Sequence, residues 1–183
     1  MIKGIVILDG PDASGKTTLA NKLIELNYGK GVILHATYRF KDKIPTYHAA
    51  ILRKAYKLSK KTLVIIDRFH VSEYIYAKVF RGGTKWPEQL PIFNQICKSL
   101  NIPIIICIPS SLEQGISWFE KTKEQRYEMF DDMKEIIKEY IDYVKKAKNV
   151  IIYNRDLTSK LDFYYEYIFD EIKKEIYREQ RMA

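Results

Sequence analysis

The stretch GPDASGKT, residues 10–17, constrains the fold of this chain more than any other feature. It follows a short apolar run and precedes a segment with apolar residues at helical spacing, which predicts a loop between a buried strand and a helix. Glycines in this pattern let backbone amides wrap around phosphate oxygens, and the following helix presents its positive end. We therefore expect ATP to be bound by Ala13, Ser14, Gly15, Lys16, Thr17 and Thr18.

Two side chains of the loop and two residues further along the chain extend this site. Lys16 is expected to reach the transferred phosphate, and the Thr17 hydroxyl is placed for Mg²⁺. Asp67 ends an apolar run, the usual position of an acid that holds Mg²⁺ through water. Arg68 follows directly, where a guanidinium can bind a second anion with two hydrogen bonds.

The remaining pattern alternates apolar runs with amphipathic segments. Strands are predicted over 2–8, 31–37, 63–67, 102–108 and 150–153. Helices are predicted over 17–27, 44–59, 71–80, 88–100, 127–148 and 157–178, with another that ends near 119. This order predicts a single α/β domain over 1–183, a P-loop NTPase-type three-layer α/β/α fold with a five-stranded parallel sheet. A short lid is expected at about 119–127.

Composition narrows the classes of partner. The net charge is +8, and the first hundred residues are the basic half, so a phosphorylated small molecule or a nucleic acid would be attracted. No run is long and apolar enough to span a membrane. The two cysteines are isolated, which suits the reducing cytoplasm, and the three histidines lack metal-ligand spacing.

Cations outside the phosphate loop bear on the second substrate. Arg39 follows the second predicted strand and Arg53 lies in the next helix, in a region with few acids. Cations suit an acceptor that is already a phosphate, whereas a hydroxyl acceptor benefits from a carboxylate base. Lys121 and Arg126 lie in the lid, where positive charge can stabilise the migrating phosphoryl group.

These motifs resemble the thymidylate kinase family of nucleoside monophosphate kinases. The family pairs an acidic residue with a loop that carries an internal Asp, as Asp9 and Asp12 do here. Its Asp-Arg motif is similar to Asp67-Arg68, and the Ser and Tyr that follow match Ser72 and Tyr76. The lid motif is approximated by the stretch QRYE, residues 125–128.

The resemblance implies roles for these residues. Arg68 would bind the acceptor phosphate, Asp12 would face the acceptor, and Tyr76 would pack against the deoxyribose. Ala13 stands where one branch of the family has an Arg, which assigns catalytic charge to Lys121 and Arg126 beside Lys16 and Arg68. The implied acceptor-binding set is Asp9, Asp12, Arg39, Arg53, Arg68, Ser72 and Tyr76.

The expected function is transfer of the ATP γ-phosphate to a deoxynucleoside monophosphate, with dTMP or a related pyrimidine nucleotide as the leading acceptor. Ala77 stands where the family has Gln, so the acceptor base can be thymine, another pyrimidine or a modified pyrimidine. The alternatives are a deoxynucleoside kinase with Glu73 as its carboxylate, a kinase of DNA ends or of modified bases in DNA, and a non-catalytic nucleotide-binding module. The family is dimeric, so the resemblance also implies a homodimer.

Overall fold

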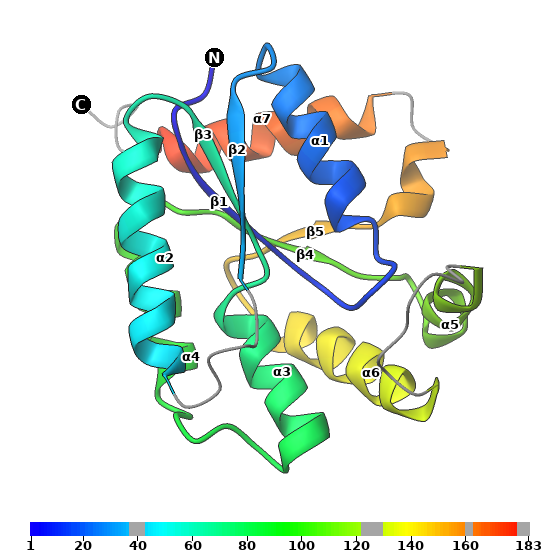
Figure 1. Ribbon diagram of the computed structural model, residues 1–183. Helices are drawn as coiled ribbons and strands as arrows, with labels where there is room; N and C mark the ends of the chain where they lie inside the picture. Colours follow the sequence, from blue (N-terminus) through cyan, green and yellow to red (C-terminus); the bar gives the residue numbers. More distant parts are fainter. Residues whose placement is uncertain (37–42, 122–129, 160–162, 179–183) are drawn as a thin grey trace.

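A parallel five-stranded sheet forms the centre of the computed structural model, which describes residues 1–36, 43–121, 130–159 and 163–178 (Figure 1). The strands are β1 (Gly4–Asp9), β2 (Gly31–His35), β3 (Leu63–Asp67), β4 (Ile104–Cys107) and β5 (Ile151–Tyr153), in the spatial order β2-β3-β1-β4-β5. β1 and β3 are buried along almost their whole length, as expected for central strands covered on both faces. This confirms the predicted three-layer α/β/α class.

Helices cover the two faces of the sheet and form two separate apolar cores (Figure 1). One core contains α1 (Lys16–Leu26) and α7 (Tyr164–Ile176), which pack together on one face. The other core contains α2 (Ile44–Ser59), α3 (His70–Arg81), α4 (Gln89–Ser99), α5 (Leu112–Lys121) and α6 (Phe130–Lys146). Alternate strand residues point into opposite cores, which accounts for the unbroken apolar runs in the sequence.

The register of the sheet brings three chain segments to one edge. Leu8 pairs with Asp67 across β1 and β3, and His35 pairs with Asp67 across β2 and β3. Asp9 pairs with Ile106 across β1 and β4. Because the strands are parallel, the phosphate loop, Arg68 and the residues after β4 all leave the sheet at its carboxyl edge, where ligands bind in open α/β sheets.

The helix predicted over 157–178 is interrupted. The structure has a short 3₁₀ helix, η2 (Arg155–Ser159), and α7 begins at Tyr164. Local polar contacts compete with an α-helix here. The Asp156 amide donates to Asn154 Oδ1 at 2.9 Å, and the Thr158 hydroxyl donates to the Arg155 carbonyl at 2.5 Å. A hydrophobic pattern alone therefore placed the start of this helix too early.

Two further expectations from the sequence concern a membrane-spanning helix and the lid. No helix in the described ranges is long and apolar enough to cross a membrane. The expected lid, 119–127, begins in α5, and its residues from 122 onward lie outside the described residues.

Candidate active site

The phosphate loop leaves β1 and enters α1 through two glycines with unusual geometry. Gly10 has φ +147°, and a Cβ built there would lie 2.2 Å from the Cys107 carbonyl oxygen, so β4 leaves no space for a side chain. Gly15 has φ +86° and is the N-cap residue of α1. Ala13 has φ +60°, a left-handed conformation that is uncommon outside glycine. The predicted strand–loop–helix context of the motif is confirmed.

Lys16 is buried within the loop and bridges its backbone. Its ammonium donates to the carbonyls of Gly10 at 3.0 Å and Pro11 at 2.6 Å. Burial, together with the nearby charge of Arg68, lowers the pKa of Lys16 to about 8. Ser14 is also buried, whereas Thr17 and Thr18 are exposed on the first turn of α1. The loop therefore presents one cation, two hydroxyls and the positive end of a helix at the sheet edge.

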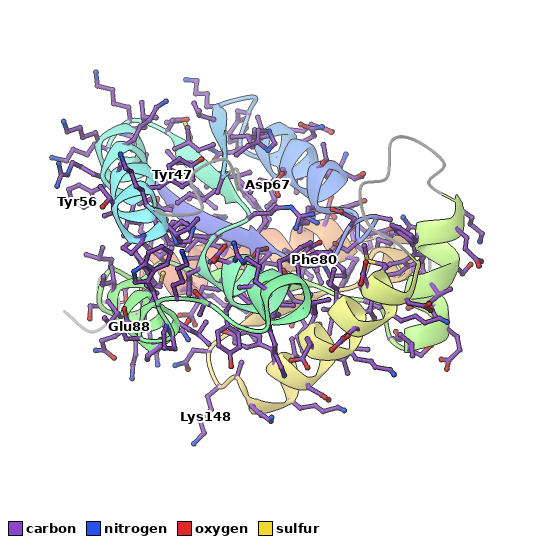
Figure 2. The ribbon with its side chains drawn as sticks, turned by 60° about the horizontal axis from the view of Figure 1, so that its bottom comes forward. Tyr47, Tyr56, Asp67, Phe80, Glu88 and Lys148 are labelled. Atoms are coloured by element: carbon purple, nitrogen blue, oxygen red, sulfur yellow. The ribbon has the colours of Figure 1, made fainter. Side chains whose placement is uncertain are left out.

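Asp67 faces this loop from the end of β3. Figure 2 turns the carboxyl edge forward and shows Asp67 between α2, which carries Tyr47, and α1. One Asp67 oxygen, Oδ2, lies 2.9 Å from His35 Nδ1. The other, Oδ1, is buried without a hydrogen-bond partner among the described residues. The carboxylate thus has one oxygen anchored and one available to a cation or its water.

Arg68 also has a left-handed backbone conformation at this edge. Its φ is +64°, and its amide donates to the Leu8 carbonyl at 2.8 Å. This turn directs the guanidinium into an ion pair with Asp12 of the phosphate loop. The guanidinium also lies 4.9 Å from the centre of the Tyr76 ring, within the range of a cation–π interaction. The structure therefore brings together three residues that the sequence had selected separately.

Asp9 and Ser72 form a buried contact beneath this edge. Both are fully buried, and the Ser72 hydroxyl and amide donate to Asp9 Oδ1, the amide at 3.1 Å. Ser72 also contacts the Tyr140 hydroxyl of α6 at 2.7 Å. Burial raises the pKa of Asp9 to about 6, against the opposing hydrogen bond from Ser72. Their observed role is to attach the start of α3 to β1, and contact with a substrate stays a prediction.

The other predicted site residues lie on the protein surface or outside the described residues. Arg53 is exposed on α2 and lines an apolar groove of about 510 Å³ between α2 and α4. Lys121 is exposed at the end of α5. Arg39 and Arg126 lie outside the described residues. The described residues contain no cluster of three or more His, Cys, Asp or Glu side chains that would hold a metal by protein ligands alone.

Glu73 does not occupy the position expected of a catalytic carboxylate. It is 4% exposed and forms an ion pair with Arg81, two turns along α3. Burial raises the pKa of Glu73, with Arg81 opposing the change. A carboxylate covered in this way is poorly suited to accept a proton from an acceptor hydroxyl.

Two residues at the site were missed by sequence reasoning. His35 was not selected, although it ends β2 beside Asp67. Arg155 donates to the Ala13 carbonyl of the phosphate loop at 2.7 Å and stacks over Trp118 of α5 at 4.4 Å. Arg155 comes two residues after the fifth predicted strand, at the carboxyl edge of the sheet. Arg68 was identified as a site residue because it follows a strand at the same edge, so the same criterion could have identified Arg155.

The sheet order, the loop and the acid–arginine pair together give the fold of P-loop nucleotide kinases. Among solved structures, the chain is similar to the YorR protein of Bacillus subtilis in complex with phosphorylated GDP. The TM-score is 0.67 at 20% identity, and the match covers 97% of this chain and 98% of that chain.

Two structures of deoxyadenosine kinase from M. mycoides are also similar. One has bound dATP, with a TM-score of 0.59 at 14% identity, and covers 92% of this chain and 98% of that chain. The other holds the products dCMP and a flexible dCDP, with a TM-score of 0.57 at 15% identity, and covers 93% and 99%. Comparisons with protein-family models and with curated protein sequences give no match. At these identities the similarity establishes the fold alone.

Proposed function

We propose that this chain is an ATP-dependent kinase of deoxynucleoside monophosphates, with dTMP or a related pyrimidine nucleotide as the leading acceptor. The observation that carries the proposal is the position of Arg68. Its guanidinium lies between Asp12 of the phosphate loop and the ring of Tyr76. A cation held beside the donor loop, next to an aromatic ring, suits the phosphate and sugar of an acceptor nucleotide.

The carboxylates near the phosphate loop already contact other side chains of the protein, which supports a phosphate acceptor over a hydroxyl acceptor. Asp9, Asp12 and Asp67 lie at or beneath this edge, and one oxygen of each contacts a side chain of the chain itself: Ser72, Arg68 and His35, respectively. The second oxygens of Asp9 and Asp67 are buried, so an acceptor hydroxyl cannot readily reach them. A hydroxyl must lose its proton during transfer, which favours a carboxylate free to accept it. A monophosphate is already anionic and gains more from cations such as Arg68.

In the proposed reaction, the loop amides and Lys16 hold the donor phosphates, while Arg68 and Tyr76 hold the acceptor. Thr17 and Asp67 are suited to Mg²⁺, because Asp67 Oδ1 is buried without a partner among the described residues and kinase Mg²⁺ is held largely by phosphate and water. When bound, Mg²⁺ would neutralise charge on the phosphates. Lys121 and the lid residue Arg126, with Arg39, would add positive charge around the migrating group.

A deoxynucleoside kinase is the second candidate. Similarity to two deoxyadenosine kinase structures over nearly their whole length favours it. Since Glu73 is covered by Arg81, the carboxylate that would serve as base is Asp12, which is 38% exposed in its ion pair with Arg68. That reaction would require Arg68 to release Asp12 when the acceptor binds.

A panel assay separates the candidates. The protein is incubated with ATP and Mg²⁺ and with each dNMP, each deoxynucleoside or a DNA oligomer, and ADP is followed. Turnover with one or more pyrimidine dNMPs is the expected result. Turnover confined to deoxynucleosides would replace the proposal with the second candidate, and turnover confined to DNA would indicate a nucleic-acid kinase. The implied homodimer is tested separately by light scattering of the same preparation.

A further inference from the structure

Arg155 contacts the phosphate loop from outside. Its Nη1 donates to the Ala13 carbonyl at 2.7 Å, although the two residues are 142 positions apart in the sequence. Its aliphatic stem lies against Gly15, where a built Cβ would be 3.1 Å from Arg155 Cβ. The side chain therefore covers the outer side of the loop at the two residues that flank Ser14.

This hydrogen bond has a consequence for the amide of Ser14. In a trans peptide unit the C=O and the following N–H point in opposite directions, and the backbone has no cis peptide bonds among the described residues. Fixing the Ala13 carbonyl on Arg155 therefore directs the Ser14 N–H away from Arg155. Ala13 is already in an uncommon left-handed conformation, so an external partner is needed to hold this unit in one orientation.

The same arginine joins the loop to α5. Its guanidinium lies 4.4 Å from the centre of the Trp118 ring, and Trp118 is 3% exposed. Trp118 Nε1 donates to both carboxylate oxygens of Asp156 at 3.0 Å. Gln114, one turn earlier on α5, also donates to Asp156. The dipeptide Arg155-Asp156 thus binds the phosphate loop with one residue and α5 with both.

We propose that Arg155 is a positioning residue for the donor site, which orients the Ala13–Ser14 peptide of the phosphate loop and couples it to α5 through Trp118 and Asp156. The inference rests on the proposed function in one respect: the ligand of the loop is the triphosphate of ATP. It does not depend on the acceptor. Because α5 ends at Lys121, the coupling also extends from the loop to the start of the expected lid.

Trp118 provides a direct readout of this coupling. The chain has two tryptophans, and Trp86→Phe leaves Trp118 as the single reporter. In that background, titration with ATP and Mg²⁺ is expected to change the Trp118 emission with saturation. Arg155→Ala should weaken ATP binding about tenfold, because the Ala13 carbonyl loses its partner and the loop loses its orientation. The emission change should disappear in the same variant.

Conservative variants separate positioning from general stability. Arg155→Lys keeps a donor for the Ala13 carbonyl but loses the flat stacking surface, so ATP affinity should recover while the emission change stays small. Asp156→Asn keeps an acceptor for Trp118, whereas Asp156→Ala does not, so only the second should reduce the emission change. Arg178→Ala, an exposed arginine paired with Glu175 far from the loop, is the matched control. Thermal unfolding of each variant identifies any that fail to fold.

The outcomes are distinct. If Arg155→Ala binds ATP with parental affinity, or keeps the parental emission change, the positioning role is wrong and the proposed kinase function is unaffected. If the parent chain binds no ATP, the donor site itself fails, and both proposals fall. If Arg155→Ala does not fold, the Arg155→Lys and Asp156→Ala results decide, since the inference requires an altered emission response in both.

Discussion

The guanidinium of Arg68 forms an ion pair with the carboxylate of Asp12, which joins the end of β3 to the phosphate loop. Arg68 is held in a left-handed conformation at φ +64°, and its side chain is 17% exposed. The pair therefore lies at the boundary between the proposed donor and acceptor sites. Its two members should respond to substitution in different ways, according to which substrate each one serves.

Substitution of Arg68 tests the acceptor site. Arg68→Ala is expected to raise KM for the monophosphate about tenfold or more, because a charged hydrogen bond to phosphate is lost. KM for ATP should change by less than about threefold, since Lys16 and the loop amides remain. Steady-state kinetics with each substrate varied in turn measure both constants. Equal increases in the two KM values would remove Arg68 from the acceptor site.

Substitution of Asp12 tests why a carboxylate lies inside an anion-binding loop. Asp12→Ala should impair use of the acceptor and largely spare ATP binding, because its partner is the acceptor-side Arg68 and not the donor. In a double-mutant cycle with Arg68→Ala, the two effects should be strongly non-additive, as for residues in direct contact. A collapse of ATP affinity in Asp12→Ala would instead show that Asp12 shapes the loop.

The sequence predicted the fold and much of this edge because those features depend on local patterns. Apolar runs of strand length and a glycine pattern before a helix are readable without tertiary information. In a parallel sheet, residues that follow different strands meet at the carboxyl edge, so Lys16, Asp67 and Arg68 could be grouped in advance. The contacts of Arg68 with Asp12 and Tyr76 follow from this convergence of chain segments at the carboxyl edge.

The remaining contacts depend on register and rotamer, which the sequence does not encode locally. His35 meets Asp67 only because β2 and β3 align at that position. Asp9 was grouped with the acceptor residues, but it is buried under α3 by hydrogen bonds from Ser72 and Phe69. The ion pair between Glu73 and Arg81 depends on the rotamer with which Arg81 reaches back along α3. The sequence pattern does not predict such side-chain contacts.

Gly10 offers a test of the packing between the phosphate loop and β4. Gly10→Ala is expected to destabilise the protein by several kcal/mol, on the order of 3, because the new Cβ would lie 2.2 Å from the Cys107 carbonyl oxygen. Gly83→Ala is the control: it has a similar positive φ of +134°, but a Cβ there meets nothing within 4 Å. Denaturant unfolding of both variants separates the clash from backbone strain, and equal losses would contradict the steric argument.

Two buried histidines should make stability depend on pH. His48 and His70 pack with Phe69 and Phe93, and burial lowers the pKa of each to about 4. A histidine with a depressed pKa contributes stability above its unfolded value of 6.5, and loses it as the pH falls through about 4. Each contribution is roughly 3 kcal/mol. Acidification from pH 7 to pH 4 should therefore destabilise the fold through both side chains.

Asp9 acts in the opposite direction, since burial raises its pKa from 3.8 to about 6. Its contribution is present below 3.8 and lost as the pH rises through 6, so acidification returns roughly 3 kcal/mol and offsets one histidine. The parent should lose stability between pH 7 and pH 4, and His48→Phe, which keeps a ring of similar size, should lose about 3 kcal/mol less. Urea unfolding at intervals across this range measures the difference. Parallel curves for parent and variant would show that His48 titrates normally in the folded protein.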